Sequence, residues 1–401
     1  MDGGNLLHKV DWKSCTSYRD VLQSYKNYVN HKYRKCAIIF DGTYDKPTTK
    51  DHEHARRGGF SSVNIKLNLN AAPHRDRAAF LANSHNKFQL INELKIILSD
   101  EGHEVYISNS DADVDIVKWA ITKSELHEKV IVVAEDTDVL ILLLHHCNEA
   151  HKNVYIMQNS KKVLKTYCIL TMKNILGQNV VKNLLAAHAW TGCDTTSAIF
   201  KIGKISIVKK LMQSNNSVLS ACQVLSDPTA TQADVHKAGS DLFALSYGAE
   251  AGTNLDYLRY LKHMQAVTTS SGVFEPQKLP PTDRAAYFHN LRSHLQIITW
   301  VTLNHNYLDP TNWGWKLNET KPGYIPILTD FPVAPEILLN FVRCKCKSSS
   351  KNTCMTMQCS CRKNGLKCVA ACANCCGPNG SGCGNAAETT VHDEDIFDYA
   401  G

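Results

Sequence analysis

The stretch "VIVVAEDTDVLILLL", residues 130–144, places two aspartates between two apolar runs. Asp136 and Asp138 follow "VIVV" and precede "LILLL", so they stand where the chain leaves the core. A bare carboxylate is expensive to bury unless a cation or a network of hydrogen-bond donors neutralises it. The stretch therefore predicts a buried strand whose end carries a charged site.

Two other segments share this pattern. The runs "CAIIFDG" (36–42), "EVYISNSD" (104–111) and "KVIVVAED" (129–136) are short, apolar and end in Gly, Asn or Asp, as buried parallel strands do. Helical spacing over residues 86–102 stops at Gly102, and "DADVDIVKWAITKSEL" begins another helix. The alternation predicts an α/β fold, with a mostly parallel, twisted sheet flanked by helices. In such sheets, ligands bind at the carboxyl ends of the strands.

Composition narrows the class of protein. The chain has 401 residues, enough for two or three domains, and a formal net charge of +6 that permits an anionic partner. It contains no apolar run of the roughly 20 residues that a membrane helix needs, and its first residues lack a secretory pattern. Six cysteines are scattered over residues 1–343 and ten lie between Cys344 and Cys383. In a chain without a signal peptide, such clustering indicates metal rather than disulfides.

Aspartates recur at the ends of the predicted strands. A single aspartate at such a position is usually a helix N-cap or a turn residue, but capping alone is a poor account of several successive ones. If the strands are parallel, the carboxylates converge, and they cannot all stay ionised without a counter-charge. Mg²⁺ (or Mn²⁺) binds through carboxylates, waters and phosphate oxygens, and two ions about 4 Å apart would support phosphodiester displacement. The set consists of Asp2, Asp41, Asp111, Asp113, Asp136, Asp138 and Asp194.

The order of these motifs resembles the flap endonuclease group of PIN-like nucleases. The matching stretches are "DGGNLLH", "IIFDG", "SDADVD", "AEDTD" and "TGCDTTSAIFKIGK", which together cover roughly residues 1–215. The resemblance implies that the seven aspartates are the metal ligands or their immediate supports. Asp115 falls outside the pattern and is expected to be an exposed helix residue. This sequence departs from the family by having Asp-Ala-Asp in place of glutamates and by lacking a strand before Asp2.

Two basic segments gain a role from this resemblance. In the family, a glycine-containing turn and a basic helix grip duplex phosphates, and "FKIGKISIVKKL" (200–211) matches them with Lys204, Lys209 and Lys210. An ordinary amphipathic helix with a solvated basic face is the alternative. The segment "TTKDHEHARR" corresponds to the start of the family's basic arch, where Lys50, Arg56 and Arg57 would clamp the scissile phosphate. The histidines His188, His145 and His146 are expected to finish helix ends rather than to bind metal.

The cysteine-rich segment has the pattern C-x-C-x7-C-x4-C-x-C-x6-C-x3-C-x2-C-C-x6-C. With few large apolar residues it cannot build a core alone, so we expect thiolate-bound Zn²⁺ to hold it. Nine bridging thiolates suit about three ions. The pattern resembles the tesmin-type CXC domain, which binds DNA. The expected ligands are Cys344, Cys346, Cys354, Cys359, Cys361, Cys368 and Cys372, with a looser match at Cys375, Cys376 and Cys383.

The role of this segment stays open at the level of sequence. The CXC family places a tyrosine in the minor groove and generally carries two copies of the domain, whereas this chain has Gln358 and one copy. Six basic residues would contact phosphates if the segment binds DNA, and a structural or protein-binding role is the alternative. They are Lys345, Lys347, Lys351, Arg362, Lys363 and Lys367.

Together these observations predict an intracellular, nuclear, metal-dependent nuclease of DNA that a zinc module positions on DNA or on a protein partner, without membrane contact. Two other functions remain: a nucleic-acid-binding protein that has kept the nuclease fold without turnover, and an interaction scaffold of mobile-element origin. The expected segments are a PIN-like nuclease domain (1–215), a helical extension with a Pro-rich linker (216–341), a CXC-type zinc domain (342–385) and an acidic disordered tail (386–401).

Overall fold

A computed structural model describes the chain in two compact units, Met1–Thr253 with Asp283–Leu328, and Asn254–Thr282 with Thr329–Gly401. The described residues are 1–42, 48–50, 52–53, 63–109, 111–160, 163–269, 276–319, 323–329, 344–347, 353–363, 366–368, 372, 374–377 and 383–386. None of the helices within these ranges is both long and apolar enough to cross a bilayer. The expected segment boundaries at residues 215, 341 and 385 stay predictions.

The first unit is an α/β fold with parallel strands, as predicted. Strand β1 (Ala37–Asp41) pairs in parallel with β2 (Glu104–Ser108), and β3 (Val130–Val133) pairs in parallel with β4 (Val154–Ser160). The last strand, β5 (Val163–Cys168), runs antiparallel to β4. The three strands expected from the apolar runs are therefore present, and the β4–β5 hairpin is an addition to them.

The first two residues join the two parallel pairs. The Ile39 amide donates a hydrogen bond of 3.0 Å to the Met1 carbonyl, and the Asp2 amide donates one of 2.9 Å to the Val133 carbonyl. Asp2 forms a parallel bridge with Ile39. The order across the sheet is thus β2, β1, the Met1–Asp2 segment, β3, β4 and β5. The strand expected to be missing before Asp2 is replaced by two residues, which place Asp2 beside Ile39 in the middle of β1.

Helices α1 (Gly3–Leu7), α2 (Tyr18–Tyr33), α4 (Arg77–Ala82) and α5 (Ser84–Asp100) surround a core that includes Phe40. Helix α2 begins in a capping box, in which Ser17 and Asp20 satisfy each other's backbone amides. Helix α5 buries leucines at i, i+4 and i+8, and each stabilises the fold by about 1.5–3 kcal/mol. These leucines are Leu90, Leu94 and Leu98.

Glycine at position 3 allows α1 to approach β1. A Cβ atom on Gly3 would lie 2.3 Å from Phe40 Cδ1 and 2.7 Å from the Ile39 carbonyl oxygen. These distances are far inside van der Waals contact, so any side chain would push α1 away from the strand. Helix α6 (Ala112–Leu126) follows β2, and α7 (Thr137–His146) follows β3. Three helices therefore begin directly after strand-like segments, at the same edge of the sheet.

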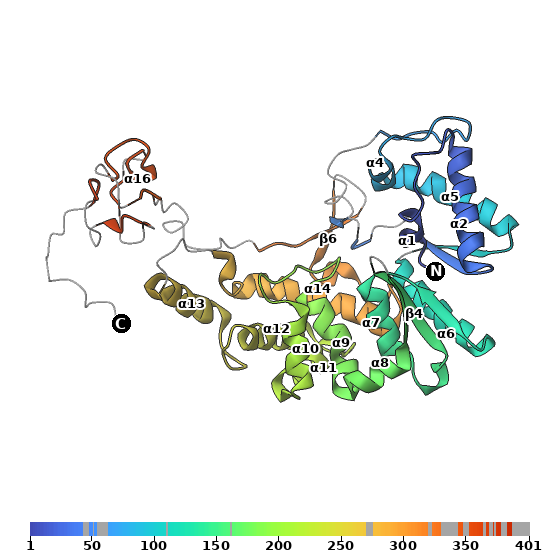
Figure 1. Ribbon diagram of the computed structural model, residues 1–401. Helices are drawn as coiled ribbons and strands as arrows, with labels where there is room; N and C mark the ends of the chain where they lie inside the picture. The colour runs from blue at the N-terminus through green and yellow to red at the C-terminus, as the bar shows by residue number, and fades with distance from the viewer. Residues whose placement is uncertain are drawn as a thin grey trace. The chain divides into compact units, whose positions relative to one another are not determined.

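A helical group completes the first unit. Figure 1 shows α9, α10, α11 and α12 grouped beside α7 and α8. Helix α14 packs against α9 and α12, and Trp190 Nε1 of α9 donates a hydrogen bond of 3.1 Å to Asn290 Oδ1 of α14. The antiparallel pair β6 (Trp315–Leu317) and β7 (Tyr324–Pro326) follows. The remaining helices are α8 (Ile169–Leu176), α9 (Gln178–Thr191), α10 (Lys204–Met212), α11 (Asn216–Leu225), α12 (Gln232–Ser246) and α14 (Asp283–Thr302).

The second unit contains the helix α13 (Leu255–Thr269) and the cysteine-rich segment with its short helix α16 (Ser360–Lys363). Seven cysteines form the buried core of this segment, with Cys346 and Cys383 half-buried against it. No leucine, isoleucine or phenylalanine takes part in that cluster, within the described residues. The sulfur atoms themselves therefore take the place of a hydrophobic core.

Candidate functional site

Six of the seven expected aspartates line one cavity of about 560 Å³. They come from five segments of the chain: the Met1–Asp2 segment, the ends of β1, β2 and β3, and the loop between α9 and α10. This is where the carboxyl ends of parallel strands place ligand-binding groups. The six are Asp2, Asp41, Asp111, Asp113, Asp136 and Asp194.

Three of these aspartates are also helix N-caps. Asp2 Oδ1 accepts from the Asn5 amide at 3.1 Å, Asp111 Oδ1 from the Asp113 amide at 3.2 Å, and Asp136 Oδ1 from the Asp138 amide at 2.9 Å. The capping role and the shared cavity are thus compatible. Each backbone amide fixes one carboxylate oxygen, and the positive ends of α1, α6 and α7 meet at the cavity.

Lys50 supplies a counter-charge inside the cavity. Its Nζ lies 2.7 Å from Asp111 Oδ2 and 3.4 Å from Asp113 Oδ2, and its side chain is 15% exposed. Although burial lowers the pKa of Lys50, the three carboxylates Asp111, Asp113 and Asp41 outweigh it and hold that pKa well above its usual value. Burial raises the pKa of Asp111, but the Lys50 ammonium outweighs burial and brings that pKa below its usual range.

The remaining carboxylates carry more negative charge than Lys50 balances. Burial and the neighbouring Asp111 hold the pKa of Asp113 well above its usual range. Burial, opposed by the Asn5 amide, raises the pKa of Asp2 to about 6. Burial and the Asp138 carboxylate also raise the pKa of Asp136. The site therefore favours the arrival of further positive charge.

The donor set fits a hard divalent cation. All of its side-chain ligands are carboxylate oxygens, which Mg²⁺ and Mn²⁺ prefer, and the Lys50 ammonium already stands in the position of a cation between two of them. Among the described residues, no three aspartates or glutamates bring one carboxylate oxygen each within 4.8 Å of one another. Binding of a cation in this cavity would therefore require the carboxylates to move closer together. The Lys50 ammonium would also have to move away from Asp111 and Asp113.

Asp138 lies apart from the cavity lining, contrary to its expected place among the metal ligands. Its Oδ1 is 2.6 Å from His188 Nε2, and the same nitrogen is 2.8 Å from Lys204 Nζ. His188 is only 2% exposed, so this contact is sealed inside the protein between α7, α9 and α10. The sequence predicted only that His188 lies at a helix end. It did not predict the contact with Asp138, because Asp138 stands 50 residues earlier in the chain.

The basic residues divide according to their exposure. Lys204, the first residue of α10, is directed to His188, whereas Lys209 is exposed and Lys210 is half-buried. Lys50 reaches the aspartates as described, while Arg56 and Arg57 lie outside the described residues. Of the residues of α10 that were predicted to bind phosphate, those in the last turn of the helix are therefore the ones that solvent reaches. Asp115, expected to be exposed, is 20% exposed in its side chain and accepts from Ser108 Oγ at 2.6 Å.

Sequence reasoning missed two residues at this cavity. Lys87 of α5 lies 3.5 Å from Asp41 Oδ2, and Glu135 lines the cavity while pairing with Lys9 at 2.5 Å. Glu135 stands in the same strand-end run as Asp136, which was an available signal. No signal in the sequence marked Lys87, because only the packing of α5 against β2 in the folded chain brings this lysine to the site.

The cysteine cluster has the spacing of thiolates around zinc. Sulfur–sulfur distances are 3.5 Å for Cys344–Cys354, 3.8 Å for Cys344–Cys368 and 3.6 Å for Cys361–Cys372. Ligands 2.3 Å from a tetrahedral Zn²⁺ would be about 3.8 Å apart, whereas a disulfide is near 2.05 Å. All sixteen cysteines, each of them in the described part of the chain, are free thiols.

Three groups of four cysteines have sulfurs within 4.8 Å of one another. Cys368 belongs to all three groups, and Cys344 and Cys354 each belong to two. Shared sulfurs are what a multinuclear cluster with bridging thiolates requires. Of the ten expected ligands, Cys346 and Cys376 fall outside these groups. The groups are Cys344, Cys354, Cys359, Cys368; Cys344, Cys361, Cys368, Cys372; and Cys354, Cys368, Cys375, Cys383.

No family model and no curated protein matches this chain. Among solved structures, the catalytic core of Rad2 in complex with a DNA substrate is 15% identical, with a TM-score of 0.34, 53% of this chain covered and 59% of that one. The bacteriophage T5 D15 protein co-crystallised with metal ions is 16% identical, with a TM-score of 0.35, covering 55% of this chain and 76% of that one. The chain thus spans about 59% of the length of the Rad2 core. Likenesses at these values carry no argument about function, which rests on the geometry of the site.

Proposed function

We propose that this chain is a divalent-metal-dependent nuclease that hydrolyses DNA phosphodiester bonds at the aspartate-lined cavity. The observation that carries the proposal is the convergence of six aspartates from five segments of the chain on one cavity of about 560 Å³. The raised pKa values of Asp2, Asp113 and Asp136 support it, because they mark an excess of negative charge. The ordered motif resemblance to flap endonucleases adds the substrate class.

Each part of the cavity has a role in this proposal. Asp2, Asp111 and Asp136 present their second oxygens, since a backbone amide already fixes the first, and Asp41, Asp113 and Asp194 complete the ligand set. Bound Mg²⁺ or Mn²⁺ would lower the pKa of water and stabilise the leaving oxygen. Lys50 and Lys87, which neutralise carboxylates in this structure, would turn to the phosphate of the substrate.

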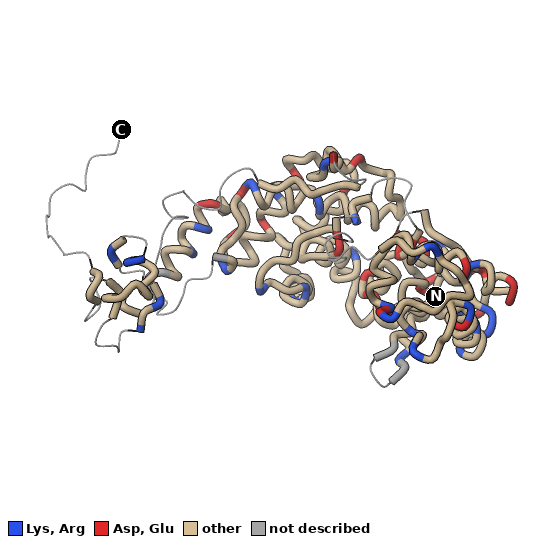
Figure 2. The backbone as a smooth tube through the Cα atoms, turned by 90° about the horizontal axis from the view of Figure 1, so that it is seen from above, with Lys and Arg blue, Asp and Glu red and all other residues tan. Residues whose placement is uncertain are grey.

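The cysteine-rich segment would position the chain on DNA. We infer a CXC-type cluster of about three Zn²⁺ from the shared cysteine groups. The described residues of this segment include five basic residues and no acidic one, and Figure 2 marks Lys and Arg along the tube in blue. These positive charges would favour contact with DNA phosphates. We also propose that the protein is nuclear and that this segment can bind protein partners. The five are Lys345, Lys347, Arg362, Lys363 and Lys367.

A second function has one observation in its favour. The ion pairs of Lys50 with Asp111 and Asp113 give the cavity a resident counter-charge. A protein that binds nucleic acid without cutting it would keep such a pair, because the pair stabilises the fold without a metal. In that case the chain would bind DNA through α10 and the cysteine-rich segment without cleaving it.

A cleavage assay decides between these functions. The substrates are end-labelled flap, duplex and single-stranded DNA, with Mg²⁺, Mn²⁺ or EDTA. The nuclease proposal expects products only with a divalent cation, and Asp136→Asn should lower their rate of formation by at least about 100-fold, because ligand loss removes the catalytic charge.

The matched control is Asp11→Asn, which removes one carboxylate at a position that is 69% exposed and outside the cavity. This variant should cut like the parent. DNA binding without products under any of these conditions would establish the second function instead.

A further inference from the structure

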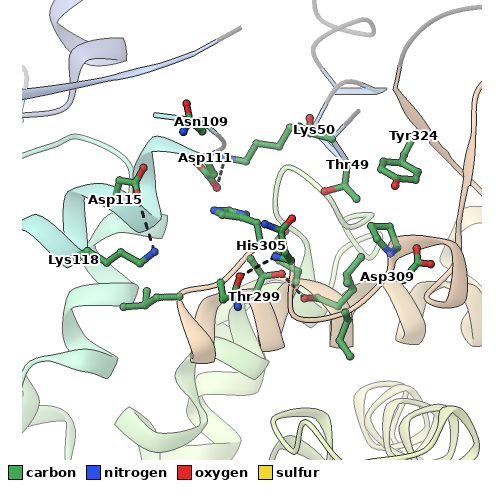
Figure 3. A pocket seen from close by; sticks show the side chains of 18 of the residues that line it. Thr49, Lys50, Asn109, Asp111, Asp115, Lys118, Thr299, His305, Asp309 and Tyr324 are labelled. Atoms are coloured by element: carbon green, nitrogen blue, oxygen red, sulfur yellow. Dashed lines mark hydrogen bonds and ion pairs between the residues drawn. The ribbon is translucent and has the colours of Figure 1, made fainter. Parts of the chain in front are cut away.

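A second cavity of about 880 Å³ adjoins the aspartate cavity and shares two of its residues, Lys50 and Asp111. Figure 3 shows Lys50 extending to Asp111 at this shared wall, with His305 beside the same carboxylate. The rest of the lining comes from residues 48–49, from β2 and the segment after it, from α6, from α14 and the loop after it, and from β7. Its volume lies in the range of about 300–1,000 Å³ that is usual for sites of small organic ligands.

The lining combines apolar surface with hydrogen-bonding groups. Four of the lining residues are apolar: Leu295, Leu303, Leu308 and Pro310. Five others carry amide or phenol groups: Asn109, Asn304, Asn306, Tyr106 and Tyr324. A nucleobase has two flat apolar faces and an edge of donors and acceptors, so it can use both kinds of residue. Tyrosine rings also offer stacking surfaces that are worth about 1–3 kcal/mol per base.

His305 gives the most specific indication that this cavity binds a ligand. Its Nε2 is buried and has no hydrogen-bond partner within the described part of the chain. Such an atom costs about 1–3 kcal/mol unless something satisfies it. An imidazole nitrogen in this position can form a hydrogen bond with the donor and acceptor groups at the edge of a base.

We propose that this second cavity binds one nucleotide unit, with its base beside His305 and its phosphate at the wall formed by Lys50 and Asp111. The placement of the phosphate rests on the proposed function, because that wall borders the cavity where the phosphodiester would be cut. A free nucleoside monophosphate and a nucleotide within a strand share this chemistry. If the ligand is a strand, the cavity makes the protein select the base next to the cut.

The binding test uses the full chain in EDTA, so that no cleavage occurs. One arm follows the four deoxynucleoside monophosphates by saturation-transfer NMR. The other follows the fluorescence of a tetranucleotide that contains 2-aminopurine. Binding in both arms, or in the tetranucleotide arm alone, supports a strand as the ligand, and binding of the mononucleotides alone supports a free nucleotide. Binding in neither arm would overturn the proposal.

Two variants locate the binding. His305→Ala removes one hydrogen bond and should weaken the affinity by about tenfold. Leu308→Trp fills the cavity and should abolish binding, and it decides the matter if the first variant does not fold. His127→Ala is the control, since it removes an exposed imidazole at the end of α6. Affinity that both folded variants retain at the parental value would contradict the proposal.

The failure of this inference can be distinguished from failure of the nuclease proposal. Asp136→Asn lies outside the lining of the second cavity, so it should retain nucleotide binding in EDTA while losing metal-dependent cleavage. If the parent binds nucleotides through His305 and never cuts DNA, the site stands and the nuclease proposal falls. If the parent cuts DNA and His305→Ala and Leu308→Trp change neither affinity nor base preference, the nuclease proposal stands and the site falls.

Discussion

At the residue scale, the aspartates combine capping with charge accumulation. The same carboxylate that fixes the first turn of α1, α6 or α7 also faces the cavity. Because one oxygen is held by a backbone amide, the orientation of the carboxylate is set before any ligand arrives. Such preorganisation is what distinguishes these residues from ordinary surface aspartates.

Metal affinity should rise steeply as the pH increases through about 6. A cation needs ionised carboxylates, and the pKa of Asp2 is raised to about 6 by burial, with Asp113 and Asp136 shifted in the same direction. The folded state therefore keeps protons that the unfolded chain loses near pH 4. Ionisation of these groups thus lowers the stability of the metal-free protein as the pH rises through this window, and metal binding restores it.

Isothermal titration with Mn²⁺ at pH 5.0 and pH 7.5 measures this effect. The affinity should be at least about tenfold higher at pH 7.5, and Asp2→Asn should reduce the difference between the two pH values. Equal affinities at both pH values would show that these carboxyl groups do not take part in binding.

Lys50→Met should destabilise the metal-free protein by an amount on the order of 3 kcal/mol, because it leaves two buried carboxylates without their partner. Mn²⁺ should then raise the melting temperature of this variant more than that of the parent. Lys87→Met is the matched control: its pair with Asp41 is longer, at 3.5 Å, and more exposed. Thermal melts with and without Mn²⁺ measure both effects, and a neutral Lys50→Met would mean that its ion pairs do not form in solution.

The residue scale also shows where sequence reasoning stops. Asp41, Asp111 and Asp136 could be placed at one edge because each ends a recognisable apolar run. Asp138 could not be separated from Asp136, since its partner His188 lies on another helix. The spacing of residues along the chain predicts which residues follow a strand. It does not predict that Asp138 faces His188, because that contact depends on how α7 and α9 pack.

At the element scale, the strands β1, β2 and β3 and the helices α5 and α6 were predictable from apolar runs and helical spacing. Strands β4 and β5 were not predicted, because neither ends in the aspartate that marks the others. The Met1–Asp2 segment was also out of reach. Two residues have no periodicity, and only their hydrogen bonds to Ile39 and Val133 give them the place of a strand.

Helix α10 should contact DNA through its exposed end. Lys209→Ala should reduce the slope of log affinity against log salt by about 1, because one phosphate contact is lost. Lys204→Ala should leave that slope unchanged, since its ammonium lies 2.8 Å from His188 Nε2, but it should lower the melting temperature. Fluorescence anisotropy on duplex DNA between low and high salt measures the slopes. A larger change for Lys204→Ala than for Lys209→Ala would contradict this assignment.

At the scale of the whole molecule, two different kinds of candidate metal ligand occur in one chain. The first unit gathers six carboxylates at its cavity, and the groups of candidate ligands in the described part of the second unit consist of cysteine sulfurs. Hard and soft ligand sets select different ions, so Mg²⁺ or Mn²⁺ and Zn²⁺ need not compete. The spacing of the cysteines in the sequence predicted that their sulfurs gather, whereas the sharing of Cys368 among three groups became visible only in the fold.

Native mass spectrometry of the full chain should show about three Zn²⁺, and Cys368→Ser should lose more than one of them, because this thiolate belongs to every group. Cys376→Ser, at a cysteine outside the three groups, should retain all of them. Two ions in the parent would indicate separate sites of four cysteines. A parent without zinc that carries disulfides would contradict the zinc assignment.

The central claim is that the aspartate cavity binds divalent cations, and anomalous X-ray diffraction from crystals grown with Mn²⁺ tests it most directly. The expected result is anomalous density within about 2.2 Å of carboxylate oxygens, with Asp136 among the ligands and Lys50 displaced from Asp111. Crystals that bind Mn²⁺ elsewhere, or that keep Lys50 between Asp111 and Asp113 with no density in the cavity, would contradict it.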